Sequence, residues 1–258
     1  MKIRRKLPKP PRLRHPSHII GYSSNAPDPS DLQRWFDLEY GGPLVFKGVE
    51  RNAAELQTYG ALVSHGPWNA WLRLSLSSSE AEEWKQRLAW RHDGASAIVG
   101  APLTPRLAID TILHAARMAR GLTLLTEGTA YDVITQVYLN PADWKDRPLD
   151  QFHVRDHIEV LQTEAAEAGL EWFYTRGLNK FGFDDIETFR PVGLPSRDIM
   201  DTLRDIADEI LRLGQSPTVG LTLPLPTLGL SLRVIRHRTA FPLDSPLALR
   251  EITWSPLT

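Results

Sequence analysis

An aromatic strand followed by two glycines carries the residues of this 258-residue sequence that are best suited to binding chemistry. Strand alternation places Trp172, Tyr174 and Arg176 on one face. Aromatic rings stack on flat ligands, and a guanidinium binds an anion or a carboxylate. Gly177 and Gly182 then bracket a predicted tight turn, which would bring backbone amides near a ligand. The segment therefore predicts a contact with a ligand or a partner.

Two interpretations of this aromatic strand remain open. In one, its side chains line a pocket to which Asp132 and His153 also contribute, as in an enzyme or a small-ligand binder. In the other, the strand is half buried, its rings pack under a loop, and Arg176 pairs with an acid such as Asp184 or Asp185. Convergence of the side chains on one concave site with perturbed pKa values would favour the pocket.

A second concentration of basic residues lies near the end of the chain. On a predicted strand, Arg236 and Arg238 share one face, whereas Arg233 and His237 take the other. These arginines are candidates for contact with a ligand or a partner. Nucleic-acid binding would need them to cluster with other basic residues and with aromatic rings, and the acidic remainder of the chain opposes it. A solvated edge strand explains the same residues, because basic side chains protect exposed sheet edges.

The N-terminal 16 residues form a basic arm on an acidic body. The arm holds seven Lys or Arg and no acid, whereas the remaining residues carry an excess of eight acids. Four prolines favour extended, polyproline-like geometry over a helix. We expect the arm to contact an acidic surface on the body, on a second subunit or on another macromolecule. Its candidate contact residues are Arg4, Arg5, Lys6, Arg12 and Arg14.

Neither a catalytic nor a metal site is predicted. His153 and His157 would share one face of a helix, but in a strand they lie roughly 13 Å apart, too far to ligate one ion. Glu127 and Asp132 flank a turn and would make an acid/base pair, but turns are rich in acids for conformational reasons. The sequence lacks nucleophile-elbow, phosphate-loop, dinucleotide and zinc-protease motifs. We therefore expect that the chain holds no cofactor and is not an enzyme.

Composition places the chain among ordinary globular proteins. It contains no cysteine, which excludes disulfides and thiolate metal sites and fits a reducing cytoplasm. No apolar run approaches the ~20 residues of a membrane-spanning helix, and no apolar core follows the basic N-terminus as it would in a signal peptide. A soluble cytoplasmic protein without a membrane contact is the expectation.

The elements that position these residues alternate irregularly between helix and strand. Capping and periodicity predict helices over residues 31–39, 79–90, 104–120 and 197–213. Apolar runs and alternation predict a hairpin over residues 61–77, turning at His65-Gly66-Pro67. They also predict strands over residues 18–22, 44–49, 95–99, 122–126, 131–139, 153–162, 170–176, 185–189, 218–225, 230–239 and 248–254. Because strands come in groups of two or three, we expect an α+β fold with a mixed or largely antiparallel sheet and about four helices. Residues 17–258 are expected to form a single domain, with a possible subdivision near residues 101–104.

Part of the chain resembles uncharacterised bacterial families of unknown function. The resemblance covers residues 104–190 and rests on Gly121–Thr123, Gly128–Asp132 and Glu171–Gly182. It implies a bacterial cytoplasmic origin and an α+β fold. It carries no established activity and therefore assigns no catalytic residue.

These observations favour a non-enzymatic protein that binds another protein, as an immunity, adaptor or assembly component does. The partner would be either a different protein or a second copy of the chain. The alternatives are an enzyme or small-ligand binder with a pocket around Trp172, Tyr174 and Arg176, and nucleic-acid contact through the arm.

Overall fold

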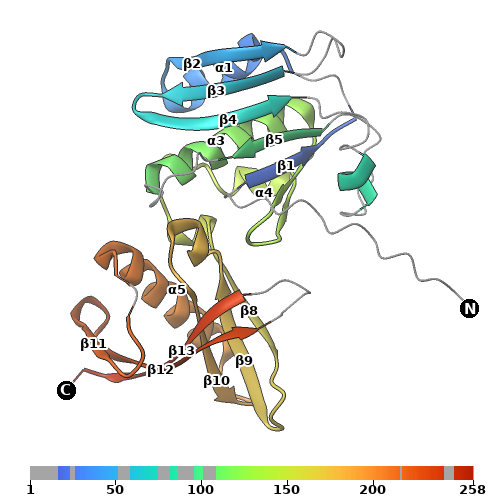
Figure 1. Ribbon diagram of the computed structural model, residues 1–258. Helices are drawn as coiled ribbons and strands as arrows, with labels where there is room; N and C mark the ends of the chain where they lie inside the picture. The colour runs from blue at the N-terminus through green and yellow to red at the C-terminus, as the bar shows by residue number, and fades with distance from the viewer. Residues whose placement is uncertain are drawn as a thin grey trace, which may run out of the picture.

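The chain folds around two separate β-sheets, each with its own hydrophobic core (Figure 1). The computed structural model describes residues 17–23, 27–51, 59–74, 82–86, 96–100, 109–215, 217–240 and 247–257. Within them the combination of helices with mostly antiparallel sheets confirms the α+β prediction. The arm and the predicted subdivision near residues 101–104 lie outside the described residues. No helix in the described part of the chain is long and apolar enough to cross a membrane.

The N-terminal sheet has seven antiparallel strands in the order β2-β3-β4-β5-β1-β6-β7. Its strands are β1 (Ser17–Gly21), β2 (Leu44–Arg51), β3 (Tyr59–His65), β4 (Trp68–Leu74), β5 (Ser96–Gly100), β6 (Thr129–Asp132) and β7 (Tyr138–Leu139). The first strand lies between β5 and β6 and is buried throughout. Ser17, where the described chain begins, therefore lies in the interior of the sheet.

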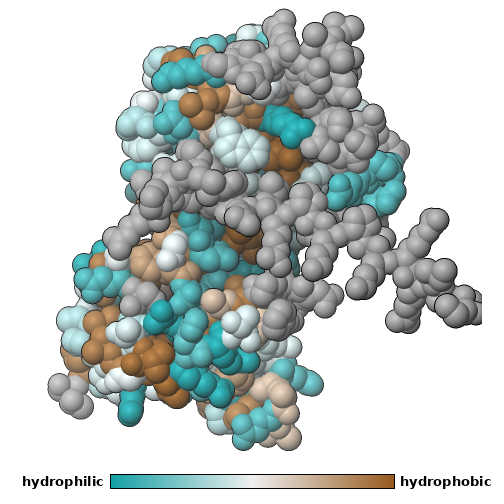
Figure 2. Space-filling view, in the orientation of Figure 1, coloured by the Kyte–Doolittle hydropathy of each residue, from teal (hydrophilic) through white to brown (hydrophobic). Residues whose placement is uncertain are grey.

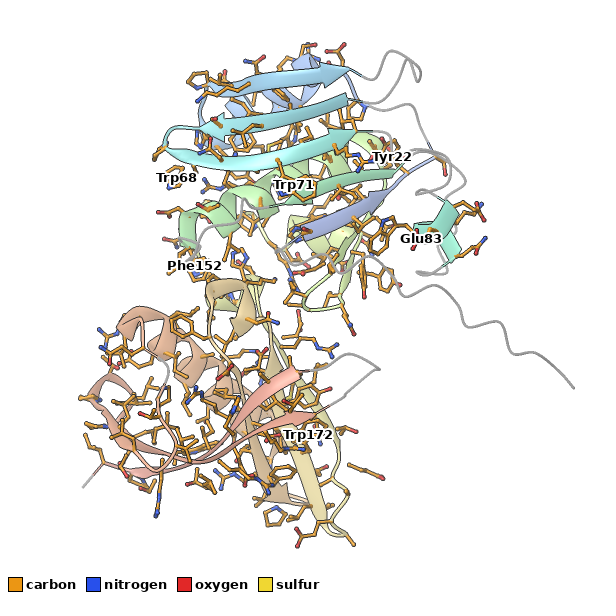
Figure 3. The ribbon with its side chains drawn as sticks, viewed as in Figure 1. Tyr22, Trp68, Trp71, Glu83, Phe152 and Trp172 are labelled. Atoms are coloured by element: carbon orange, nitrogen blue, oxygen red, sulfur yellow. The ribbon has the colours of Figure 1, made fainter. Side chains whose placement is uncertain are left out.

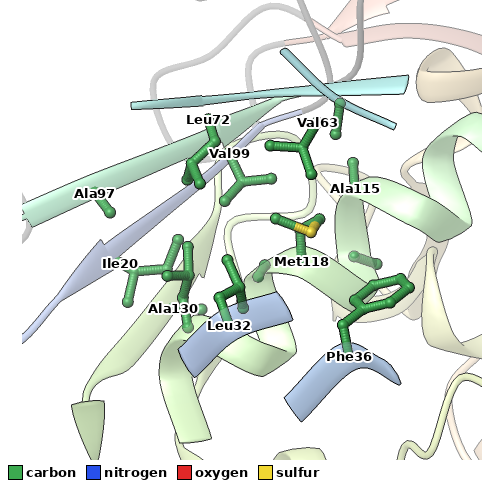
Figure 4. Close-up of a cluster of buried hydrophobic side chains, with 14 of the residues drawn as sticks. Ile20, Leu32, Phe36, Val63, Leu72, Ala97, Val99, Ala115, Met118 and Ala130 are labelled. Atoms are coloured by element: carbon green, nitrogen blue, oxygen red, sulfur yellow. The ribbon is translucent and has the colours of Figure 1, made fainter. Parts of the chain in front are cut away.

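Helices α1 (Pro29–Tyr40), α3 (Ile109–Thr126) and α4 (Pro141–Lys145) accompany this sheet. Asp28 caps α1, because its carboxylate accepts a hydrogen bond from the Ser30 amide at 2.8 Å. The small side chains of Ala115 and Ala119 let α3 approach the sheet closely, and Met118 fills the space beside them (Figure 4). This helix therefore packs closely on the sheet.

The C-terminal sheet has six strands in the order β11-β12-β13-β10-β9-β8. Its strands are β8 (Glu159–Glu164), β9 (Leu170–Arg176), β10 (Asp185–Pro191), β11 (Thr222–Leu225), β12 (Leu230–Ala240) and β13 (Leu247–Pro256). Only the β10–β13 pair is parallel among the described strands. The sheet is therefore mixed but largely antiparallel, as predicted.

Helix α5 (Ser196–Leu213) covers one face of the C-terminal sheet. Ile199, Leu203, Ile206 and Ile210 are buried against Phe173 and other strand residues, as their helical spacing predicts. Gly214 ends the helix in the left-handed conformation, with its amide donating to the Ile210 carbonyl at 3.0 Å. The opposite face of the sheet carries Trp172 and Tyr174.

Several predicted boundaries are wrong; the strand expected over residues 218–225, for example, begins only at Thr222. Residues 122–126 are not a strand, because α3 continues past Gly121 to Thr126. The predicted strand 131–139 is a short hairpin, β6 and β7, with a turn between them. The predicted strand 153–162 begins only at Glu159, and a 3-10 turn, η1 (Val154–Asp156), precedes it.

The two halves of the chain meet around Phe152, which packs against both cores (Figure 3). Ile112 of α3 belongs to the core of the C-terminal sheet, so a helix of the first half is packed into the second. Polar contacts from the β6–β7 turn also reach the C-terminal sheet. These contacts bring Asp132 and Arg176 close to the same junction.

Candidate functional site: an aromatic groove on the C-terminal sheet

Trp172 lies in a stack of three aromatic rings on the face of the sheet opposite α5. Its ring centroid is 4.3 Å from that of Tyr174 and 6.4 Å from that of Phe189, and the ring planes are tilted by 26° and 12°, respectively. Strand pairing explains the arrangement, because Phe189 is the direct partner of Trp172 across β9 and β10. Trp172 and Phe189 are partly exposed, whereas Tyr174 is buried.

Glu187 fixes the position of Trp172 and Arg238 together. This carboxylate is fully buried and accepts a hydrogen bond from the Trp172 indole nitrogen at 2.8 Å. Arg238 donates to both of its oxygens, from Nε at 2.6 Å and from Nη2 at 2.5 Å. This hydrogen-bonded ion pair raises the pKa of Arg238. The buried charge is thus matched by a bidentate partner, which holds the guanidinium in one orientation.

The same guanidinium lies beside the aromatic stack. The Cζ of Arg238 is 5.1 Å from the Trp172 ring centroid and 5.5 Å from that of Phe189. Both distances are within the range of cation–π attraction. Aromatic planes and an arginine are therefore prepositioned before any ligand arrives.

A β-bulge decides which arginines join this surface. The β12–β13 register shifts between Val234 and Arg236, so Ile235 is the extra residue. Arg236 then pairs with Glu251 and shares a face with Arg238, as predicted. Arg233 pairs with Thr253, two residues from Glu251, which puts it on that face as well. The prediction that Arg233 takes the opposite face is wrong, because simple alternation does not anticipate a bulge.

Together these residues form a groove of about 790 Å³, called here the aromatic groove. It crosses five neighbouring strands, from the β8–β9 turn to β12. Its lining is Glu164, Ala165, Ala166, Glu167, Leu170, Trp172, Phe189, Arg236, Arg238, Ala240 and Glu251. On the face in Figure 2, hydrophobic and hydrophilic residues are interspersed over the C-terminal half. The groove thus combines an apolar floor with charged ends.

Arg176 lies on the same strand face but does not line the groove. Its side chain is only 2% exposed, and its guanidinium donates to the Gln136 side chain in the turn after β6. Of the expected partners, Asp184 pairs with Arg250 at 2.8 Å. Asp185 accepts hydrogen bonds from the Thr175 hydroxyl and the Leu178 amide, and it lies close enough to Arg176 for that charge to favour its ionised form. Arg176 therefore joins the two halves of the chain.

Asp132 lies in the same junction, in a buried ion pair with Lys180. Burial by itself would raise the pKa of Asp132, but the Lys180 ammonium group holds it well below its usual range. His18 Nε2 is 3.8 Å from the Asp132 carboxylate, and burial lowers the pKa of His18 to about 4. His18 is thus neutral near pH 7, and Asp132 and Lys180 form a balanced pair of charges.

The turn predicted between Gly177 and Gly182 contributes a residue to this junction. Gly177 and Gly182 flank a 3-10 turn, η2 (Leu178–Phe181), which presents Lys180 to Asp132. The Leu178 amide donates to the Asp185 carboxylate at 3.0 Å rather than pointing at a groove. Burial raises the pKa of Asp185 to about 7, and its Oδ2 has no hydrogen-bond partner among the described residues.

His153 lies at a different groove, of about 910 Å³, beside the acidic side of α5. Asp201, Asp205 and Asp208 line it from the helix. Burial and its two aspartate neighbours raise the pKa of Asp205. His157 points elsewhere: its ring is buried and stacks on Phe152 at 4.8 Å. Within the described residues no group of three or more His, Cys, Asp or Glu side chains is arranged so that it could hold a metal ion.

The predicted contact residues thus fall into three places. Trp172, Tyr174 and the three arginines of β12 share the groove face, Asp132 and Arg176 lie in the buried junction, and His153 lines the second groove. They do not converge on one concave site. Sequence reasoning missed Glu187 and Phe189, although both lie in the predicted strand 185–189 and alternate onto one face.

Comparisons with models of protein families, with curated proteins and with solved structures found no match to this chain.

Proposed function

We propose that this chain is a non-enzymatic protein-binding component of a bacterial cytoplasm, of the immunity, adaptor or assembly type, and that its partner binds in the aromatic groove. The bacterial and cytoplasmic parts of the proposal rest on the resemblance of residues 104–190. The binding role rests on one observation: Trp172 is partly exposed yet held rigidly by Tyr174, Phe189 and Glu187.

A rigid tryptophan beside an arginine is typical of the residues that dominate protein interfaces. Trp, Tyr and Arg are the types enriched among such energetic centres. A fixed side chain loses little conformational entropy when a partner binds, so more of the contact energy appears as affinity. The hydrogen bond from Trp172 to Glu187 and the ion pair of Glu187 with Arg238 supply that rigidity.

The charges of the groove favour binding over catalysis. Glu187 is neutralised by Arg238, and Glu251 is paired with Arg236. A general acid or base must reach a proton of the substrate, and both of these carboxylates already accept hydrogen bonds from arginine guanidinium groups. Asp132, which an acid/base mechanism would use, lies in the buried junction with Lys180.

Affinity purification from the native host tests the proposal. We expect the wild-type chain to retain a defined set of proteins at physiological salt, and Trp172→Ala to lose them. Removing an interface tryptophan of this kind weakens binding by about 2 kcal/mol or more. Leu38→Ala is the matched control, because Leu38 is 82% exposed on α1, far from the groove in sequence and fold.

Folding of Trp172→Ala is checked by circular dichroism and thermal unfolding. Glu167→Lys provides a second variant, because Glu167 is exposed at the groove end and its replacement does not disturb the core. A wild-type chain that retains nothing, or a retained set that both variants leave unchanged, would refute binding at the groove.

A further inference from the structure

We infer that the aromatic groove is occupied by the basic, proline-rich arm of the same chain, residues 1–16. The inference rests on the proposed function, since it names a polypeptide that the groove takes. An external partner would then bind by displacing the arm. Three properties of the groove and the arm carry the inference: ring chemistry, charge and reach.

The first property is the match between prolines and flat aromatic rings. Pro8, Pro10 and Pro11 favour a polyproline II conformation, which loses little entropy on binding. Proline-rich segments of this kind dock in grooves lined by aromatic side chains. Trp172 and Phe189 offer such a floor, with ring planes 12° apart.

The second property is charge. The arm carries seven Lys or Arg and no acid. Glu164 and Glu167 are exposed at the β8–β9 end of the groove, where they face solvent. The basic residues of the groove, Arg236 and Arg238, are already paired with glutamates, so they repel an incoming lysine less than free arginines would.

The third property is reach. The arm joins β1 at Ser17, whose carbonyl accepts a hydrogen bond from the Val133 amide at 3.0 Å. Gln136 of the same turn contacts Arg176, and Trp172 lies four residues back along β9, roughly 13 Å away. Pro8 lies nine residues before Ser17 and can therefore reach about 28 Å from it in a polyproline II helix. The arm is therefore long enough to pass the junction and enter the groove of its own chain.

Site-specific photocrosslinking of the full-length chain tests the inference. A benzophenone amino acid replaces Lys9, and the crosslinked peptides are identified by mass spectrometry. We expect crosslinks to β9 or β10 peptides that contain Trp172 or Phe189, in the monomer fraction. Molar salt should reduce the yield, because the contact has an electrostatic component.

Variants of the full-length chain make the test specific. Trp172→Ala should lower the crosslink yield by up to about tenfold, the change expected for the loss of 1.4 kcal/mol of binding. Glu167→Lys should lower it by up to about fivefold without touching a buried residue. Replacing Pro8, Pro10 and Pro11 by serine should lower it while keeping the charge of the arm. Leu38→Ala should leave the yield unchanged.

Several outcomes would overturn the inference. Crosslinks that map to α5 or to the N-terminal sheet would show that the arm docks elsewhere. Crosslinks to the groove that occur only in a dimer would show that the arm of a second copy, and not the chain's own arm, occupies the groove. If Lys9 crosslinks avoid the groove while the Trp172-dependent partner is still retained, the inference fails and the proposed function stands. If instead no partner is retained while Lys9 still crosslinks to the groove, the proposed function fails and the inference about the arm stands.

Discussion

Lys180 donates a hydrogen bond to Asp132 across the junction between the two sheets. Their side chains are 2% and 6% exposed, and Lys180 also donates to the His157 carbonyl at 2.7 Å. The two residues are 48 positions apart, one in the turn after β9 and the other at the end of β6. The pair therefore connects the two halves of the chain through a buried charge.

Asp132→Leu should destabilise the protein by about 3–5 kcal/mol, because it leaves the Lys180 ammonium group buried without its carboxylate. Urea unfolding, followed by circular dichroism, measures the change. The double variant Asp132→Leu/Lys180→Met removes both charges, and we expect it to recover most of the lost stability. A single variant as stable as the wild type would contradict a role for this pair in holding the halves together.

Asp185 should make the protein less stable as the pH rises. Its folded-state pKa is raised to about 7 from an ordinary value of 3.8, so the folded chain binds the extra proton between these values. Stability contributed by this group is full below pH 3.8 and lost as the pH rises to 7, by at most about 1.4 kcal/mol per pH unit.

Asp185→Asn tests this pH dependence. The amide keeps an oxygen to accept from the Leu178 amide, and it cannot ionise. Urea unfolding at pH 5 and pH 8 should show the variant gaining stability relative to the wild type at the higher pH. The exposed Asp208→Asn controls for the change in net charge. An equal difference at both pH values would mean that Asp185 does not titrate in this range.

His18 should remain neutral in the folded protein at a pH where an ordinary histidine is half protonated. Burial lowers its pKa to about 4, so the unfolded chain binds more protons than the folded chain between pH 4 and 6.5. Its contribution to stability is therefore full above pH 6.5 and falls as the pH drops to 4. Nitrogen-15 NMR of the imidazole at pH 5.5 measures this directly, with the urea-unfolded chain as control. Protonation of His18 near pH 6.5 in the folded chain would refute the assignment.

Local periodicity was sufficient to predict the strand that carries Trp172 and the helix that covers the other face. Residues 170–176 form β9 as predicted, and residues 197–213 agree with α5 to one residue. Both patterns report which side of an element is buried, and burial is the strongest signal in a single sequence. The residues of the aromatic groove that lie on β9 and β12 could therefore be predicted from the sequence.

The remaining features depend on contacts between distant residues. The helix predicted over residues 104–120 ends before Gly121, but this glycine lies inside α3, where an added Cβ would come within 2.6 Å of the Trp35 ring. The glycine is needed for close packing on α1, not for termination. Likewise, neither the partner of Lys180 nor the bulge at Ile235 has a local signature, because tertiary pairing and sheet register decide them.

Gly177→Ala should destabilise the protein more than Gly182→Ala. Both glycines have positive φ, +130° and +82°, which L side chains adopt with strain. At Gly177 an added Cβ would also lie 2.7 Å from the His157 carbonyl oxygen, whereas at Gly182 it meets no atom within 4 Å. We expect losses of about 3 kcal/mol and about 1 kcal/mol, respectively, in urea unfolding. Gly177 begins the turn that carries Lys180. The loss of stability caused by Asp132→Leu should therefore be smaller in the Gly177→Ala background than in the wild type. Equal losses for the two glycines, or an unchanged effect of Asp132→Leu in the Gly177→Ala background, would show that this turn does not set the position of Lys180.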